Sequence, residues 1–180
     1  ALGISASVQS GSAARQATEE RLAAIVLDRE TVLVDYIAQI GDDLRTTATN
    51  PNTLAALTAF HDGYHDLGNV PTERLQQLYI EDNPHPTGEK ENLDQASDGS
   101  SYSRAHGRFH PWFRQFLRAR GYYDIFLFDD DGNLVYTVFK ELDYATNLND
   151  GEYRDTDLGH ALRTAMAGGD AETHFFEFQA

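Results

Sequence analysis

The chain contains no cysteine, one methionine, one tryptophan and only two lysines, Lys90 and Lys140, among its 180 residues. The absence of cysteine excludes disulfide bonds, thiolate metal centres, iron–sulfur clusters and a cysteine nucleophile. The 14 basic residues form no cluster and are outnumbered by 29 acidic ones, which gives a formal net charge of −15. Nucleic acids and anionic lipid surfaces require concentrated Lys and Arg, so neither is an expected partner.

Long apolar runs and catalytic motifs are also missing. The longest unbroken apolar run, Leu22–Leu27, is too short to cross a bilayer. We find no P-loop, no GxGxxG fingerprint, no GxSxG elbow and no HExxH zinc motif. The sequence therefore predicts a protein that is not an enzyme, with no catalytic residues and no cofactor.

The apolar content is nevertheless sufficient for a packed interior. Hydrophobic residues make up 41% of the chain, and 9 Tyr and 10 Phe supply most of the aromatic surface. A chain of this length forms one domain with a substantial core. We expect residues 1–180 to be a single domain, with a long helix and a return helix in 1–70, a helical and loop segment in 71–120 and a sheet portion in 121–180.

Helical periodicity dominates the first half of the chain. Apolar residues recur at steps of three and four and predict one long amphipathic helix over residues 12–47. Asn50-Pro51 ends this helix, and a second helix begins near Pro51. A third helix is expected over 72–80, followed by a polar loop over 81–106 and a helix leading to Gly121. The stripe of the first helix consists of Leu22, Ile25, Arg29, Leu33, Tyr36, Ile40 and Leu44.

Strand signals are concentrated in the last third of the chain. The runs 122–128 and 134–139 are rich in aromatic and β-branched residues, and the Asp/Gly/Asn turn between them predicts a hairpin. A helix is expected over 157–166 and a third strand over 174–178. Helices followed by antiparallel strands indicate an α+β fold. Because three strands would leave an exposed apolar edge, we expect further strands after residue 180.

The hairpin region also holds the candidate ligand-binding residues. Aromatic walls with a few polar anchors are typical of small-molecule pockets. The alternative is that the aromatic residues form the core and that residues 140–143 are a solvated strand end. The candidates are Arg114, Tyr122, Tyr123, Asp124, Tyr136, Lys140, Glu141, Asp143, Thr146 and Asn147.

Histidines and aspartates suggest two possible metal sites. His61 and His65 are four residues apart, as are His106 and His110, and helical pairs at this spacing can bind zinc, copper or haem iron. The alternative is scattered surface histidine, so no metal is the primary expectation. The run 129–131 resembles the start of a calcium loop, but it lacks the closing Glu, and a plain turn is favoured.

Several segments resemble the sensor region of bacterial methyl-accepting chemotaxis proteins, which also occurs in membrane-bound nucleotide cyclases and histidine kinases. These segments are Tyr79–Leu93, Tyr102–Gly107, His110-Pro111, Gly121–Phe128, Gly132–Leu142 and Asp143–Leu148. The resemblance covers about residues 20–165, and the strand–turn–strand segment is its most specific part. The amino-acid-binding signature of double Cache sensors is absent, which leaves the ligand class open.

The resemblance implies a Cache-type, PAS-like antiparallel sheet packed with a long N-terminal helix, here truncated at the C-terminus. It implies an extracytoplasmic sensor in the cell inner membrane, facing the periplasm or the exterior, held by flanking helices outside this sequence. Such a domain binds a small molecule and passes a helix shift across the membrane. Because long helices of this kind often pair in parallel, we also expect a parallel homodimer. The rival interpretations are a metal- or haem-binding module using the paired histidines, and a ligand-free dimerisation spacer.

Overall fold

The computed structural model describes residues 2–169 and 172–176, with side chains from Arg15 onward. The chain divides into two units, one comprising the residues up to Thr46 and the other the residues from Thr47 onward. The fold class is α+β, because five α-helices accompany one small antiparallel sheet in the described part of the chain. The sequence prediction of an α+β chain is confirmed at this level.

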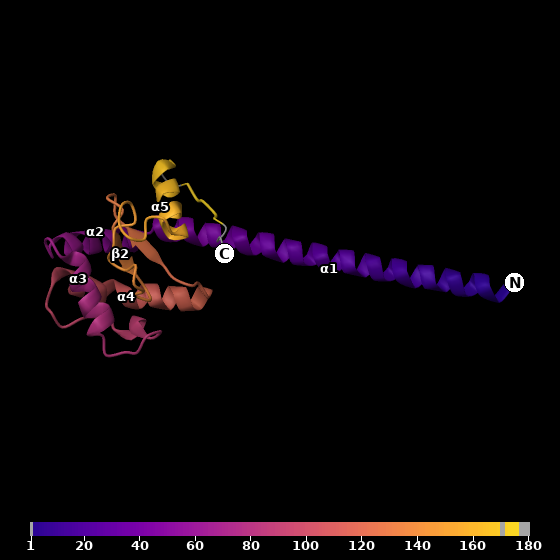
Figure 1. Cartoon of the computed structure of the whole chain (residues 1–180), viewed down its shortest axis with the longest axis horizontal. Coiled ribbons are helices and arrows are strands. Elements are labelled where there is room, and N and C mark those ends of the chain that lie inside the picture. Colours follow the sequence, from indigo (N-terminus) through magenta and orange to yellow (C-terminus); the bar gives the residue numbers. More distant parts are fainter. Residues whose placement is uncertain (1, 170–171, 177–180) are drawn as a thin grey trace. The chain divides into compact units, whose positions relative to one another are not determined.

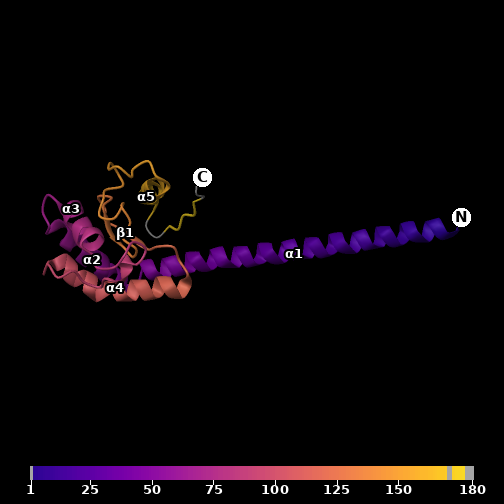
Figure 2. The same cartoon turned by 60° about the horizontal axis from the view of Figure 1, so that its bottom comes forward.

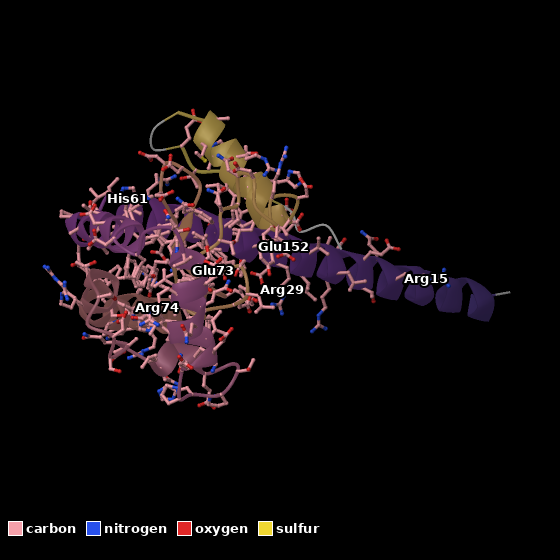
Figure 3. All side chains as sticks on the ribbon, turned by 60° about the vertical axis from the view of Figure 1, so that its left-hand side comes forward. Arg15, Arg29, His61, Glu73, Arg74 and Glu152 are labelled. Atoms are coloured by element: carbon pink, nitrogen blue, oxygen red, sulfur yellow. The ribbon has the colours of Figure 1, made fainter. Side chains whose placement is uncertain are left out.

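The first unit is formed by the long helix α1, Leu2–Ala48 (Figure 1). It begins ten residues before the predicted start at residue 12 and ends within one residue of the predicted end. Side chains project to both sides of its ribbon, among them Arg15 and Arg29 (Figure 3). Ten large hydrophobic side chains of α1 are exposed, from Leu22 to Leu44. No helix in the described part of the chain is both long enough and apolar enough to cross a membrane.

The apolar stripe of α1 has a period of eleven residues. Leu22, Leu33 and Leu44 are separated by eleven positions, and the same step relates Ile25 to Tyr36. An eleven-residue repeat corresponds to about 3.67 residues per turn, close to the 3.6 of a straight helix. The stripe therefore runs almost parallel to the helix axis.

In the second unit, helix α2, Pro51–His65, lies beside helix α4, Ser101–Arg120 (Figure 2). The side chain of Asn50 caps α2 by accepting a hydrogen bond from the N–H of Asn52, at 2.8 Å. The two helices approach closely at Gly63, where an added Cβ would lie 2.6 Å from the Cα of Tyr102. No larger residue fits at this crossing without moving one of the helices.

The connection from α2 to α4 is partly helical. Helix α3, Pro71–Gln76, continues into a π-helical turn η1, Gln77–Glu81, and a 3-10 turn η2 covers Lys90–Asn92. The predicted polar loop over 81–106 is therefore wrong at its end, because α4 begins at Ser101. The hydroxyl of Ser100 accepts the N–H of Ser103 and starts the helix there. Gly121 ends α4 in the left-handed conformation at φ 71°.

The sheet consists of two short strands, β1, Phe126–Phe128, and β2, Leu134–Thr137, paired antiparallel. The predicted hairpin is present, but the strands over 122–128 and 134–139 are too long. Asp124 explains much of the difference, because its carboxylate accepts the N–H groups of Ile125 and Val138 in place of a ladder partner. The predicted strand over 174–178 is wrong for residues 174–176, which form no strand, and residues 177 and 178 lie outside the described part.

Two hydrophobic clusters form the core of the second unit. The larger one joins α2, α3, η1, α4 and β2, and is built mainly from Phe and Tyr. The smaller one contains Leu134, Leu148 and Leu162, and Leu162 lies on helix α5, Asp157–Ala167. Helix α5 was predicted over 157–166, and it begins where the hydroxyl of Thr156 accepts the N–H of Gly159. Of the candidate ligand residues, Tyr136 belongs to the larger cluster and Tyr122 packs against it.

Candidate functional site

Lys140 lies in the interior of the second unit with 4% of its surface exposed. Its Nζ is 4.6 Å from the ring centre of Tyr136, 5.0 Å from that of Tyr144 and 5.9 Å from that of Tyr79. These three tyrosines, here called the tyrosine cage, come from β2, from the segment after it and from η1. Aromatic faces attract cations within about 6 Å, so all three rings are placed to interact with the ammonium group of Lys140.

The charge of Lys140 is poorly compensated. Its ammonium donates to the carbonyl oxygen of Thr137, and it takes part in none of the ion pairs among the described residues. Burial lowers the pKa of Lys140 from 10.5 to about 7, although the negative charges of Asp124 and Glu91 oppose this shift. A buried cation without a carboxylate partner costs folding free energy.

The backbone at Lys140 is also strained. Its φ is 61°, in the left-handed region that costs an L-residue other than Gly, Asn or Asp about 1–2 kcal/mol. Asp124 fixes the backbone that leads to Lys140, because its carboxylate accepts hydrogen bonds from Thr137 Oγ1 at 2.9 Å and from the N–H of Val138 at 2.8 Å. Burial raises the pKa of Asp124 despite these hydrogen bonds. Strain of this kind is typical of functional positions.

Tyrosine hydroxyls connect the cage to α4. Tyr144 donates to the hydroxyl of Tyr102 at 2.8 Å, and Tyr102 donates to the carbonyl of Val135 at 2.6 Å. The hydroxyl of Tyr79 donates to Ser103 Oγ at 3.0 Å. Burial raises the pKa of Tyr79 to about 12 and raises that of Tyr144 well above its ordinary value, so these phenols remain neutral. The cage is therefore held by uncharged hydrogen bonds.

His106 and His110 stack beside the cage, with ring centres 4.3 Å apart. His110 Nε2 donates to the carbonyl of Glu91 at 2.7 Å, and its Nδ1 accepts from the hydroxyl of Tyr136 at 2.7 Å. Burial, followed by the charge of Lys140, lowers the pKa of His110 to about 3 and that of His106 well below its ordinary value. His106 Nδ1 donates to the carbonyl of Asp94, and its Nε2 has no hydrogen-bond partner among the described residues.

The candidate ligand residues of the sequence separate into groups. Asp124, Tyr136 and Lys140 lie together at the end of β2. Asn147 instead braces the turn between the strands by donating to Asn133 Oδ1 at 2.9 Å, and Thr146 donates to the carbonyl of Asp143 at 2.6 Å. Burial raises the pKa of Asp143 to about 6, and the charge of Glu141 adds to this shift.

The remaining candidates lie away from the cage interior. Tyr123 is 72% exposed and donates to Glu141 Oε1 at 2.8 Å. Tyr122 is partly buried against Phe116. Arg114 pairs with Asp94 at 2.7 Å and donates to the carbonyl of Glu91, which ties α4 to η2. A shallow groove on α4 is lined by Pro111, Arg114, Gln115, Arg118 and Ala119.

Sequence reasoning missed Tyr79, Tyr102 and Tyr144 as members of one site. Tyr79 and Tyr136 are far apart in the sequence, and no local pattern shows that η1 meets β2. The available signal was the resemblance, since the segments Tyr79–Leu93, Gly132–Leu142 and Asp143–Leu148 each contain one cage tyrosine. Because each of these three segments contains a tyrosine, the three tyrosines could have been assigned to one site.

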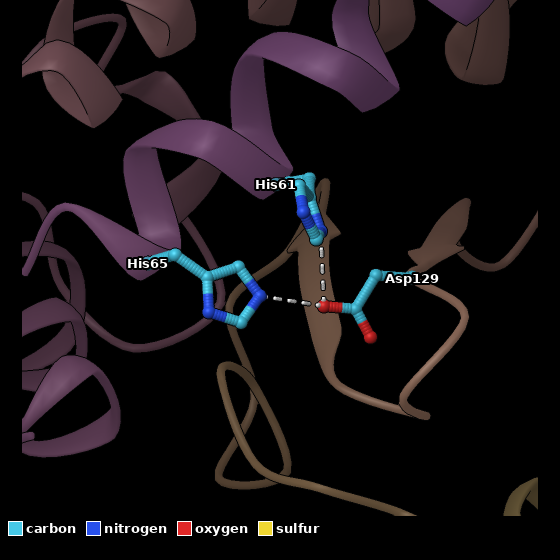
Figure 4. A group of neighbouring side chains, drawn as sticks. All are labelled: His61, His65 and Asp129. Carbon is cyan, nitrogen blue, oxygen red and sulfur yellow. Dashed lines mark hydrogen bonds and ion pairs between the residues drawn. The ribbon is translucent and has the colours of Figure 1, made fainter. Parts of the chain in front are cut away.

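A second cluster joins His61 and His65 of α2 with Asp129 of the β1–β2 turn (Figure 4). Asp129 Oδ2 is 3.4 Å from His61 Nδ1 and 3.4 Å from His65 Nε2. The turn interpretation of residues 129–131 agrees with the geometry, because Asp129 Oδ1 accepts the N–H groups of Asp131 and Asn133. Burial raises the pKa of Asp129, but these and the other hydrogen bonds outweigh it and leave the pKa below its ordinary value.

The two histidine pairs therefore have different surroundings. His106 and His110 are buried and hydrogen-bonded within the core, whereas His61 and His65 have side chains 43% and 45% exposed. The second unit thus contains a buried ammonium surrounded by three tyrosines and, separately, a partly exposed cluster of two imidazoles with one carboxylate. Comparison with protein-family models, with curated proteins and with solved structures gives no match.

Proposed function

We propose that this chain is the extracytoplasmic ligand-sensing domain of a transmembrane signal-transduction receptor, in the first instance a methyl-accepting chemotaxis protein. The proposal places it in the cell inner membrane, facing the periplasm or the exterior, with a PAS-like sheet completed by strands after residue 180. It has no catalytic role. The sequence resemblance supports this assignment, because the segments that carry it are the ones that contribute Tyr79, Tyr136 and Tyr144 to the cage.

The observation that carries the proposal is the caged ammonium of Lys140. A structural core gains nothing from a buried cation at a strained backbone position, whereas a receptor gains a site that already recognises cations. In this proposal Lys140 is a tethered occupant of the cage. The external ligand is a small organic cation that takes its place, while Lys140 moves with the exposed residues Glu141 and Leu142 into solvent.

In this proposal the cage has two states, one occupied by Lys140 and one occupied by the external cation. A receptor signals by changing between two such states. A ligand shifts such an equilibrium only by its difference in affinity for the two states, and about 1–3 kcal/mol is typical of coupling between sites. In the proposed receptor this difference is passed on as a small shift of the long N-terminal helix.

Tetramethylammonium and choline test the proposal directly. We expect Lys140→Ala to bind both cations at least about tenfold more tightly than the parent chain, because the tethered ammonium no longer competes for the cage. Thermal melting and titration calorimetry measure the change, since a ligand specific to the folded state raises the melting temperature.

Two controls sharpen this experiment. Lys90→Ala removes the only other lysine and leaves the cage unchanged, so its cation affinity equals that of the parent chain. The neutral isostere of choline, 3,3-dimethylbutan-1-ol, matches its shape without the charge and does not bind. Equal affinity of the parent and Lys140→Ala for both cations, or equal binding of the neutral isostere, rules out the cage as a cation receptor.

The proposed partner of α1 is a second copy of the chain, arranged in parallel. The stripe from Leu22 to Leu44 provides a largely exposed apolar face interrupted by Arg29, and its eleven-residue period keeps that face on one side of the helix. Because the chain has no cysteine, a single introduced one accepts a spin label at a unique position.

We expect labels at Arg29→Cys, on the stripe, to lie closer together in the dimer than labels at Thr31→Cys, which faces the opposite side. Pulsed electron–electron double resonance measures both distances. Equal distances at the two positions, or no dipolar coupling at either, exclude a dimer formed through this stripe.

A further inference from the structure

Three potential metal ligands from two separate parts of the second unit converge on one point. His61 and His65 occupy positions i and i+4 of α2, so both imidazoles leave the same face of the helix. Asp129 follows β1 and directs its carboxylate between them (Figure 4). One ligand atom from each residue lies within 4.8 Å of the other two.

The distances match a coordination shell better than ordinary hydrogen bonds. Both imidazole nitrogens are 3.4 Å from Asp129 Oδ2, beyond the usual range of about 2.7–3.2 Å for N–H···O bonds. Two ligand atoms about 2.0–2.1 Å from a tetrahedral zinc ion are about 3.3 Å apart, which is close to the observed separation. A small metal ion can therefore contact all three groups with little rearrangement.

Neighbouring groups hold the carboxylate in place. Asp129 Oδ1 accepts the N–H of Asn133 at 2.9 Å and the N–H of Asp131 at 3.1 Å, and Asn133 Nδ2 donates to both carboxylate oxygens. Hydrogen bonds of this kind orient metal ligands in known sites. The Asp129 side chain is 2% exposed, whereas His61 and His65 are nearly half exposed and leave a path from solvent.

We infer that His61, His65 and Asp129 bind a divalent transition-metal ion, with Zn²⁺ the best match to two imidazoles and one carboxylate. Three protein ligands leave the fourth tetrahedral position to water or to an external donor. The bound ion joins α2 to the β1–β2 turn. This inference is independent of the cation-sensing proposal, because the two sites share no residue.

Zinc titration of the metal-free chain tests the inference. We expect one Zn²⁺ per chain by calorimetry, and a melting temperature raised by about 5 °C or more at a hundredfold excess over the dissociation constant. Co²⁺ in the same site gives the intense visible d–d absorption of tetrahedral coordination, and Zn²⁺ abolishes it by displacement. A parent chain that binds no Zn²⁺ overturns the inference before any variant is made.

Variants locate the ion. His61→Gln and His65→Gln are each expected to weaken Zn²⁺ binding by about tenfold or more, and their half-exposed side chains leave the metal-free melting temperature unchanged. Asp129→Asn keeps the turn-forming side-chain oxygen and removes the charge, so it weakens binding similarly. His160→Gln, on the exposed face of α5, is the matched control and retains the parent affinity and Co²⁺ spectrum. Undiminished Zn²⁺ binding in the double variant of His61 and His65 overturns the assignment.

Discussion

Lys140→Met is expected to raise the free energy of unfolding at pH 7 by about 1–4 kcal/mol, the range found when buried charges are replaced by apolar side chains of similar volume. Lys140 is buried, its partner is a carbonyl oxygen, and a thioether makes favourable contacts with aromatic rings such as those of the tyrosine cage. Asp124 keeps its hydrogen bonds from Ile125, Thr137 and Val138, so the substitution leaves its carboxylate with hydrogen-bond partners.

The gain in stability depends on pH in a defined direction. The pKa of Lys140 is about 7 in the folded chain and 10.5 in the unfolded chain, so the unfolded chain binds the proton more tightly. The destabilisation by Lys140 is fully present below about pH 7 and disappears as the pH rises to 10.5. The stability difference between Lys140→Met and the parent chain should therefore shrink between pH 7 and pH 10.

Urea unfolding of both chains at pH 7 and pH 10 measures this change. Lys90→Met is the control, since Lys90 is the only other lysine and is partly exposed, with its Nζ donating to the carbonyl of Asn83 at 3.2 Å. Its effect is expected to stay within about 0.5 kcal/mol at both pH values. A Lys140→Met chain that is less stable than the parent at pH 7 would show that the caged ammonium stabilises the fold.

Gly63→Ala is expected to lower the free energy of unfolding by about 2–3 kcal/mol, the cost of overpacking a close contact. The added Cβ would lie 2.6 Å from the Cα and 2.8 Å from the N of Tyr102, which are backbone atoms of α4 and cannot rotate away. Helices α2 and α4 must separate, and Tyr102 moves with its hydrogen bonds to Tyr144 and Val135. The loss therefore reaches the tyrosine cage.

Gly107→Ala is the matched control for this substitution. Gly107 also lies within a helix, but its added Cβ would meet first the Oε1 of Gln95, the end of an exposed and flexible side chain, at 2.4 Å. Both substitutions carry the same gain in helix propensity, about 1 kcal/mol. Gly107→Ala should leave stability within about 1 kcal/mol of the parent in the same urea experiment. Equal effects of the two substitutions would mean that α2 and α4 are not in tight contact at Gly63.

Local chemistry made the helices predictable. The three- and four-residue steps and the Asn50-Pro51 stop place the end of α1 and the start of α2, and Gly121 marks the end of α4. The strands were overextended because aromatic and β-branched composition says nothing of Asp124, whose side chain replaces ladder hydrogen bonds. The start of α4 was missed because Ser100 and the residues after it are mostly polar. The buried residues in the first turns of α4 are covered by tertiary contacts, which the sequence does not reveal.

The sites were harder to predict than the elements. Tyr136 and Lys140 were candidates because the predicted hairpin would bring aromatic and polar residues close together, but Tyr79 reaches the cage through a π-helical turn that has no sequence signature. The pairing of His61 with His65 was visible in the spacing, whereas the third member, Asp129, lies 64 positions beyond His65 and is brought there by the fold. Contacts between segments that are distant along the chain could not be predicted from the sequence.

The length and period of α1 have a consequence for building hybrid proteins. A helix of 47 residues extends about 70 Å, and its stripe returns to the same azimuth after every eleven residues. A graft that adds or removes eleven residues keeps the azimuth of every stripe residue upstream of the junction. A graft that is two residues shorter turns those residues by about 200°, onto the opposite side of the rod. Junctions in α1 should accordingly be chosen by angle as well as by length.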